Sequence, residues 1–273
     1  MRRGVSALLA VLALAGCGRV GEEKSGARLT LLLPCVLSGP LQKVAAAYQD
    51  SYPQVRVTTQ IEKPLPLLSR ALASSQAPAV VITAGEVEMN YLAQAGAVGQ
   101  GQVRAFAVNT FPLTVIAPSQ AKQPLGSLRD LARAQRVFLE DPSRSTLGAR
   151  AEQAFRRLGL WEEIAPKIVA LDPEAMVLSE LAAGKADAAV VFRDCLFAEG
   201  GSGGSPPRTI RIIADLPQDS YPPIHYQAAP LKAAPPSPAA PDFVAFLTSP
   251  EGIAALKAAG LAPAARPSKP SEK

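Results

Sequence analysis

The chain has 273 residues, of which 48% are hydrophobic and 19% charged, and its formal net charge is +5. This mild charge, without a cluster of Lys and Arg that alternates with aromatic residues, argues against nucleic-acid binding. The single histidine, His225, argues against a histidine metal site or a Ser-His-Asp triad, and no Walker-type glycine-rich loop is present, so we expect no catalytic residues, metal or other cofactor.

Residues 1–17 are typical of a secretory signal, with two arginines, an apolar run over 5–15, and small residues before Cys17. The run is too short to span a bilayer, which takes about 20 apolar residues. The segment Leu14-Ala15-Gly16-Cys17 resembles a bacterial lipobox, whose cysteine is lipidated; an uncleaved anchor helix or a chance cysteine is the alternative. We expect an exported protein, lipid-anchored to a membrane in the periplasm or at the cell surface, with residues 18–28 as a flexible tether.

The next part of the chain alternates between strand and helix patterns. Short apolar or alternating runs predict strands, and apolar residues at helical spacing predict helices between them. The predicted strands are 29–33, 55–59 and 79–83, and the predicted helices are 41–48 and 67–73. This order favours an α/β fold with a mostly parallel sheet.

The same alternation returns further along the chain. The predicted strands are 113–117, 137–139, 168–171, 188–192, 210–213 and 226–231. The predicted helices are 147–158, capped by Ser145 or Thr146, then 175–183, 241–247 and 250–259. Residues 200–207 and 233–241 are typical of surface loops, and 265–273 of a disordered tail.

Seven segments in this order resemble the periplasmic molybdate-binding proteins, a branch of the type II solute-binding fold. The segments are residues 29–30 with 37–41, 77–84, 89–92, 141–161, 184–192, 216–226 and 247–252. The most specific segment is 141–161, in which Asp141-Pro142 and Gly148 precede Leu158-Gly159-Leu160-Trp161. The resemblance covers residues 29–262, nearly the whole chain after the signal.

The resemblance implies two lobes, each a mostly parallel sheet flanked by helices, that close by a hinge motion on a ligand between them. Lobe I would comprise 29–115 and 198–264, and lobe II 116–197. The implied function is capture of a small solute, a molybdate- or tungstate-like oxyanion, for an ABC importer whose membrane permease is the partner. We expect a monomer. Helix N-termini in such a fold attract anions through free N–H groups and the helix dipole.

The ligand-binding positions implied by the resemblance carry few of the family's hydroxyl groups. They are Cys35, Val36, Ser38, Pro64, Ser145, Thr146, Leu147, Glu174 and Phe192. A remodelled oxyanion site would use Ser38, Ser145, Thr146 and main-chain amides. The alternatives are a different ligand in the same fold, either a thiophilic metal or a small organic solute, and a divergent sensor or interaction protein without a transport role.

Cys35 and Cys195 each follow a strand whose end would face the other lobe in this fold. They could form a disulfide that blocks hinge motion, remain two buried thiols, or converge as soft metal ligands. The alternative from another class is a hydrolytic enzyme, which needs convergent carboxylates; the acidic candidates are Glu140, Asp141 and Asp194. Asp141, which precedes a proline, is more typical of a turn.

Overall fold

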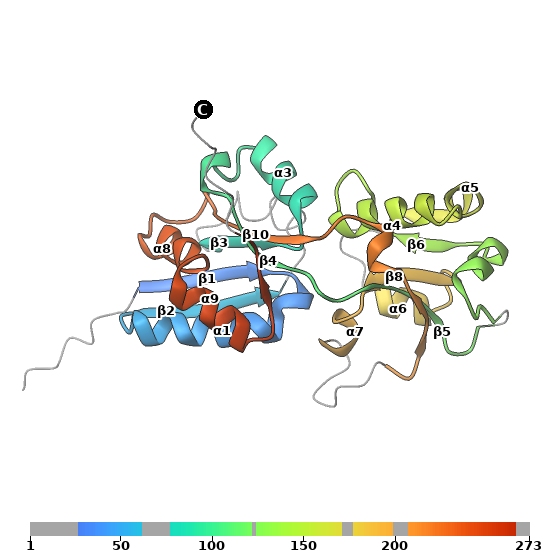
Figure 1. Cartoon of the computed structure of the whole chain (residues 1–273), viewed down its shortest axis with the longest axis horizontal. Coiled ribbons are helices and arrows are strands. Elements are labelled where there is room, and N and C mark those ends of the chain that lie inside the picture. The colour runs from blue at the N-terminus through green and yellow to red at the C-terminus, as the bar shows by residue number, and fades with distance from the viewer. Residues whose placement is uncertain (1–26, 62–76, 122–123, 171–176, 199–206, 266–273) are drawn as a thin grey trace, which may run out of the picture.

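The computed structural model describes residues 27–61, 77–121, 124–170, 177–198 and 207–265. Two β-sheets lie side by side, each flanked by helices, and Figure 1 shows them as the cores of two lobes. The largest apolar core cluster contains buried residues of both lobes, and two smaller clusters each belong to one lobe.

The first lobe holds a six-stranded sheet with the strand order β11-β4-β10-β3-β1-β2. The strands are β1 (Ala27–Leu33), β2 (Val55–Ile61), β3 (Val80–Thr83), β4 (Arg104–Val108), β10 (His225–Pro230) and β11 (Ala262–Pro263). Strand β1 is parallel to β2 and β3, whereas β10 is antiparallel to β3 and β4. Leu31, Leu32 and Leu33 of β1 are all buried, as expected of a strand covered on both faces.

Helices cover both faces of this sheet (Figure 1). They are α1 (Ser38–Ser51), α3 (Glu86–Gln94), α8 (Ala239–Phe246) and α9 (Pro250–Ala258), with short 3-10 turns at Cys35–Leu37 and Gln100–Gln102. Tyr48 of α1 packs against Phe243 and Phe246 of α8, with ring centroids 5.1 and 5.2 Å apart. These aromatic contacts fix α1 against the C-terminal helices.

The second lobe holds a five-stranded sheet with the order β7-β6-β8-β5-β9. Its strands are β5 (Leu113–Pro118), β6 (Val137–Leu139), β7 (Ile168–Ala170), β8 (Ala188–Phe192) and β9 (Ile210–Asp215). Its helices are α4 (Thr146–Arg157), α5 (Trp161–Ile164), α6 (Val177–Ala182) and α7 (Cys195–Ala198), with 3-10 turns at Leu128–Arg133 and Ala165–Lys167. Strands β7, β6 and β8 are parallel, and β5 runs antiparallel to both β8 and β9.

Two segments, residues 109–112 and 216–224, carry the chain between the lobes, and the second contains the 3-10 turn Gln218–Ser220. They are held together because the Asn109 amide donates to the Ile224 carbonyl at 2.8 Å and the Leu113 amide donates to the Tyr221 hydroxyl at 3.2 Å. These two adjacent segments connect the two sheets.

The sheet topology corrects the predicted lobe boundaries. The boundary expected between 115 and 116 falls inside β5, and β9, expected in lobe I, belongs to the second sheet. The reason is that β9 pairs with β5, so the chain leaves the second lobe only after Asp215. The two-lobed α/β class is confirmed, while each sheet is mixed because the crossing strands run antiparallel to their neighbours.

Most predicted elements have counterparts shifted at their ends by a few residues. Strands β4 and β11 were not predicted. Strand β11 has only two residues, whereas β4 carries an apolar run, 105–108, that the prediction missed. The predicted helix at 67–73, the signal, most of the tether and nearly all of the tail lie outside the described residues. Within the described part of the chain, no helix has the length and apolar character needed to cross a membrane.

Candidate functional site

The ends of four parallel strands point toward the junction of the lobes and lead directly into helices. In the first lobe these are β1, which leads into α1, and β3, which leads into α3. In the second lobe they are β6, which leads into α4, and β8, which leads into α7. In open α/β sheets, ligands bind outside the carboxyl ends of the strands, so this junction is the candidate site.

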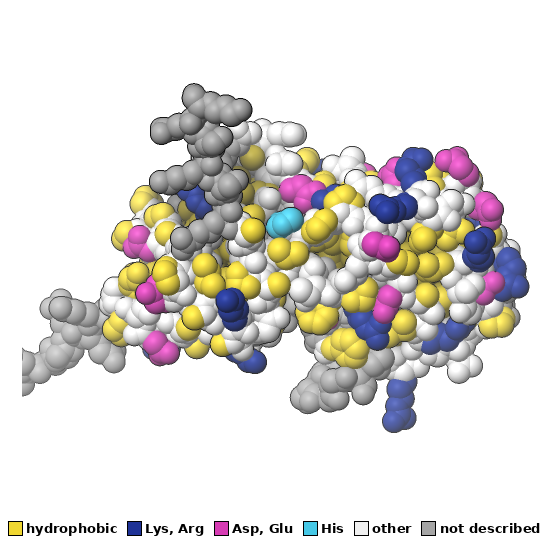
Figure 2. Space-filling view, in the orientation of Figure 1, with side chains coloured by type: hydrophobic (Ala, Val, Ile, Leu, Met, Phe, Trp, Pro, Cys, Tyr) yellow, Lys and Arg dark blue, Asp and Glu magenta, His cyan; other side chains and the backbone are white. Residues whose placement is uncertain are grey.

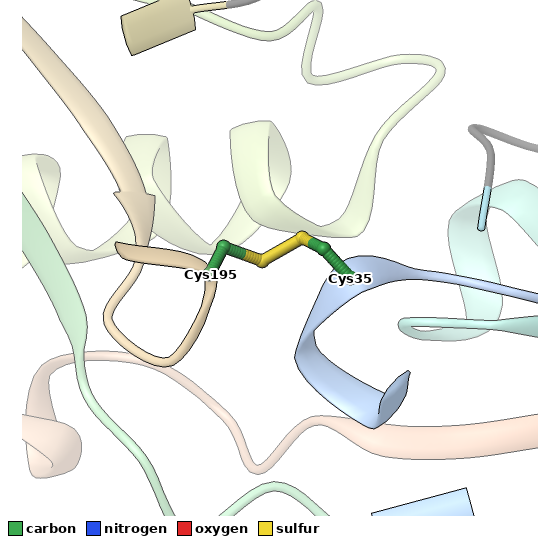
Figure 3. The surroundings of a disulfide bond; sticks show 2 residues. All are labelled: Cys35 and Cys195. Atoms are coloured by element: carbon green, nitrogen blue, oxygen red, sulfur yellow. A yellow bond between two sulfur atoms is a disulfide. The ribbon is translucent and has the colours of Figure 1, made fainter. Parts of the chain in front are cut away.

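A disulfide joins the lobes on one side of the junction. Cys35, directly after β1, is bonded to Cys195, which begins α7, with the two Cα atoms 5.5 Å apart (Figure 3). Of the three possibilities for this pair, the disulfide is therefore the one observed. Two free thiols and a soft-metal site are both wrong, because the two sulfur atoms are bonded to each other. Elsewhere in the described ranges, no group of three or more His, Cys, Asp or Glu residues is placed to hold a metal ion.

A polar contact between α3 and α4 joins the lobes at a second place. The carboxylate of Glu88 accepts a hydrogen bond from the Thr146 amide at 2.9 Å and one from the Thr146 hydroxyl at 2.6 Å. The Thr146 hydroxyl in turn accepts from the Val87 amide at 3.1 Å. Glu88 is 7% exposed and Thr146 is 0% exposed, so this contact is closed to solvent.

Two further contacts extend this junction along α4. Arg150, one turn beyond Thr146, forms a short ion pair with Glu86, and its buried Nε has no hydrogen-bond partner. Arg144 donates to the Tyr91 hydroxyl at 3.1 Å and lies over the same ring, 5.2 Å from its centroid. The loop before α4 and the start of α4 are thus both in contact with side chains of the other lobe.

Two glycines, Gly85 and Gly148, allow a close approach of chain segments at the same junction. Gly85 precedes α3, and a Cβ atom added there would lie 2.4 Å from side-chain atoms of Thr146. In α4, a Cβ atom on Gly148 would lie 2.1 Å from the Glu140 carbonyl oxygen. Glycine at both positions lets α3, α4 and the loop before α4 come together without a clash.

Side chains of the protein already accept hydrogen bonds from the backbone amides at the start of α4. Ser145 is the N-cap, and its hydroxyl accepts from the Gly148 amide at 3.3 Å while donating to the Glu140 carboxylate. Burial raises the pKa of Glu88 above its ordinary value; the hydrogen bonds from Thr146 lower it, and the charge of Glu140 adds to the rise. The prediction that Ser145 or Thr146 caps this helix is confirmed for Ser145.

Near the disulfide, burial raises the pKa of Asp194 to about 6, against the opposing effect of the Arg193 charge. The Tyr226 hydroxyl is buried without a hydrogen-bond partner, and its pKa is raised by burial and then by the charge of Asp194. Over the second lobe, Lys and Arg side chains are interspersed with Asp and Glu on the face that Figure 2 shows.

The comparisons with known proteins decide the family. A family model described as bacterial extracellular solute-binding protein matches residues 29–262. The chain belongs to this family. It is 22% identical over 253 residues to YvgL of Bacillus subtilis, whose name describes it as an ABC transporter substrate-binding lipoprotein. The match covers 91% of this chain and 93% of YvgL.

Two molybdate-binding proteins also resemble this solute-binding protein. The molybdate-binding protein ModA of Rhodobacter capsulatus is 24% identical over 265 residues, covering 95% of this chain and 96% of ModA. The periplasmic molybdate-binding protein of Azotobacter vinelandii has the same fold, with a TM-score of 0.57 and 18% identity over 85% of this chain and 98% of that one. The resemblance and fold expected from the sequence are confirmed, and the family is one of binding proteins rather than enzymes.

The residues predicted to bind ligand fall into three groups in this solute-binding protein. Cys35, Ser145 and Thr146 lie at the interlobe junction. Val36, Leu147 and Phe192 have side chains buried in the hydrophobic core. Ser38 is half-buried at the start of α1, and its amide donates to the Cys35 carbonyl. Pro64, Glu174 and the predicted lipidation site Cys17 lie outside the described residues.

The residues that sequence reasoning missed are Glu86, Glu88, Tyr91 and Arg150. Acids in a first helical turn are ordinary, so Glu86 and Glu88 carried no special signal. One signal was available for Glu88: it shares the buried face of α3 with Met89 and Leu92, an unusual position for a carboxylate. Asp141 builds a turn, as expected, because it accepts from the Ser143 amide at 2.8 Å.

Proposed function

We propose that this chain is the extracytoplasmic capture component of an ABC importer, anchored through a lipid on Cys17 and holding a small solute between its lobes. The observation that carries the proposal is the junction itself, where the carboxyl ends of strands from two hinged lobes meet. The family match and the name of the YvgL relative support the transport role and the anchor. The membrane permease is the expected partner.

A molybdate- or tungstate-like oxyanion is the first solute to test. The ModA relatives, matched over nearly the whole chain, support it. The start of α4 has amides and hydroxyls of the kind that bind an oxyanion, and in this structure Glu88 accepts from Thr146 and Glu140 accepts from Ser145. A monomeric protein that closes over one anion remains our expectation.

A thermal-shift titration of the chain from residue 18 onward, with molybdate, tungstate and sulfate, tests this solute. Because an interlobe disulfide restricts hinge opening, each anion is titrated with and without reductant. At 100 times its dissociation constant, a ligand stabilises the folded state by about 2.7 kcal/mol. A saturable rise in Tm with molybdate or tungstate, larger than with sulfate, supports oxyanion capture. A folded protein with no rise in either redox state rejects it.

A second candidate is a binding or sensor protein of the same fold with a different solute. Two observations favour it: Glu88 already occupies the first amide of α4, and Cys35–Cys195 ties the lobes together. A solute that carries a hydrogen-bond donor would suit the Asp194 carboxyl group better than an oxyanion does. Stabilisation by an amine or a neutral solute, with no response to oxyanions, would select this candidate.

The lipid anchor has its own test. Expression of the full chain in a bacterial host should place the wild type in the membrane fraction and allow labelling with a radioactive fatty acid. Cys17→Ser should abolish the labelling, while Cys35→Ser should retain it. Labelling of Cys17→Ser, or none of the wild type, would contradict the anchor.

A further inference from the structure

The contact between Glu88 and Thr146 has the chemistry of an anion bound at the start of a helix. Helix α4 has 12 residues, and its first amides carry the partial positive charge of a helix N-terminus. The Glu88 carboxylate takes two hydrogen bonds there, from the Thr146 amide at 2.9 Å and the Thr146 hydroxyl at 2.6 Å. A dissolved carboxylate or oxyanion would use the same donors.

The carboxylate comes from the opposite lobe. Glu88 belongs to α3 of the first lobe and Thr146 to α4 of the second, and the two are 58 positions apart in the sequence. In a hinged binding protein, a solute stabilises the closed state by contacting both lobes at once. Glu88 makes this kind of bridge from within the chain.

A second positive group, the Arg150 guanidinium, lies near Thr146. Arg150 lies one turn further along α4, is 8% exposed, and pairs with Glu86 while its buried Nε has no hydrogen-bond partner. The same face of α4 therefore presents a helix N-terminus, a hydroxyl and a guanidinium. This set of donors matches an anion, and the protein fills it with two of its own carboxylates.

We propose that Glu88 is an internal anion that occupies the start of α4 in place of a dissolved anionic solute, and so determines which solutes this site accepts. The proposal rests on the proposed function in one respect, that solutes bind between the lobes. While Glu88 is in place, an oxyanion finds the Thr146 donors taken and meets a buried negative charge beside them. Solutes without a negative charge at that position are favoured.

The test removes the carboxylate and asks whether a dissolved anion takes its place. Glu88→Ala and the wild type, as the full chain without its predicted signal, are titrated with formate and with sulfate in a thermal-shift assay. Chloride at matched ionic strength corrects for screening. Glu152→Ala is the control variant, because it removes an α4 carboxylate that pairs with Arg156 and does not touch the junction.

We expect formate and sulfate to stabilise Glu88→Ala with saturation, and with an apparent affinity about tenfold or more above that for the wild type or Glu152→Ala. The disulfide keeps the lobes joined in the variant, so the donors stay in place. Equal responses of Glu88→Ala and the wild type, or no response of Glu88→Ala beyond that to chloride, would overturn the proposal.

If Glu88→Ala does not fold, Glu88→Ser answers the same question. Serine vacates the space at the Thr146 donors and loses the charge but keeps a hydroxyl for the buried contact, so sulfate should stabilise this variant more than the wild type, and an equal response would reject the internal anion. Neither result depends on which solute is imported, because formate and sulfate serve only as probes. The proposed function fails separately, if wild type responds to no solute of any charge.

Discussion

Helices α4 and α9 begin with the same local device and end up in different roles. Ser145 caps α4 by accepting from the Gly148 amide at 3.3 Å, and Ser249 caps α9 by accepting from the Gly252 amide at 3.0 Å. In both, a Cβ atom on the glycine would clash with a backbone carbonyl oxygen.

The difference lies at the first helical position. In α9 it is Pro250, which has no N–H to offer, whereas in α4 it is Thr146, whose amide and hydroxyl bind Glu88 of the other lobe. A serine cap three residues before a glycine therefore predicts where a helix starts. The same pattern does not show which helix start contacts the other lobe, because that depends on which side chains the tertiary structure places beside it.

The largest expected effect comes from separating the lobes. Replacing both cysteines, Cys35→Ser with Cys195→Ser, should lower the free energy of unfolding by about 2–5 kcal/mol, because the disulfide restricts the unfolded chain. Urea denaturation measures the loss. Hydrogen exchange should rise in the first turn of α4 and stay unchanged in the first turn of α9. Equal changes in the two helices would show that the α4 start does not depend on the interlobe contact.

A smaller effect is expected when a methyl group is inserted between the lobes. Gly85→Ala should destabilise the protein by about 1–3 kcal/mol, because the new Cβ overlaps Thr146 and forces α3 away from α4. Small-angle scattering of the reduced variant should show a larger radius of gyration than for reduced wild type. Gly252→Ala is the control: its clash with the Phe246 carbonyl lies within the first lobe, so it should lower stability without moving the lobes. A larger radius in both variants would argue against an interlobe role for Gly85.

The two serine caps provide a matched pair. Ser249→Ala should cost about 1 kcal/mol, the usual value for an N-cap. Ser145→Ala should cost more, because Glu140 also loses the hydrogen bond that this hydroxyl donates. Chemical denaturation of both variants at pH 7 compares them, and an equal cost would mean that the Glu140 contact adds nothing to stability.

The smallest effect is a pH dependence at the junction. Because burial raises the pKa of Asp194 to about 6 in the folded protein, the folded state binds its proton more tightly than the unfolded state does. This contribution to stability is complete below about pH 4 and is lost as the pH rises through about 6. The free energy of unfolding of the wild type should therefore fall relative to that of Asp194→Asn over this window.

Asp194 is half-buried, so solvent screening should keep the difference below about 1 kcal/mol. Denaturation at pH 4, 5, 6 and 7 measures it. Ser249→Ala changes no titratable group and should keep a constant offset from the wild type. A difference for Asp194→Asn that does not vary with pH would mean that Asp194 has no role in this dependence.

The sequence by itself determined the local elements and the family. Apolar runs such as 29–33 and 188–192 mark strands buried on both faces, and serine caps mark helix starts, because these signals lie in consecutive residues. The order of the elements was enough to identify the family and the two-lobed fold, which the family match and the sheet topology confirm.

Only the tertiary structure decided which residues meet. The pairing of Cys35 with Cys195 spans 160 positions, and the contact of Glu88 with Thr146 spans 58. The same holds for β9, which joins the second sheet through its pairing with β5. Such contacts follow from how two lobes pack across a hinge, and no pattern of neighbouring residues encodes that packing. The charge that occupies the start of α4 is therefore a property of the fold, supplied by a glutamate that looked ordinary in its own helix.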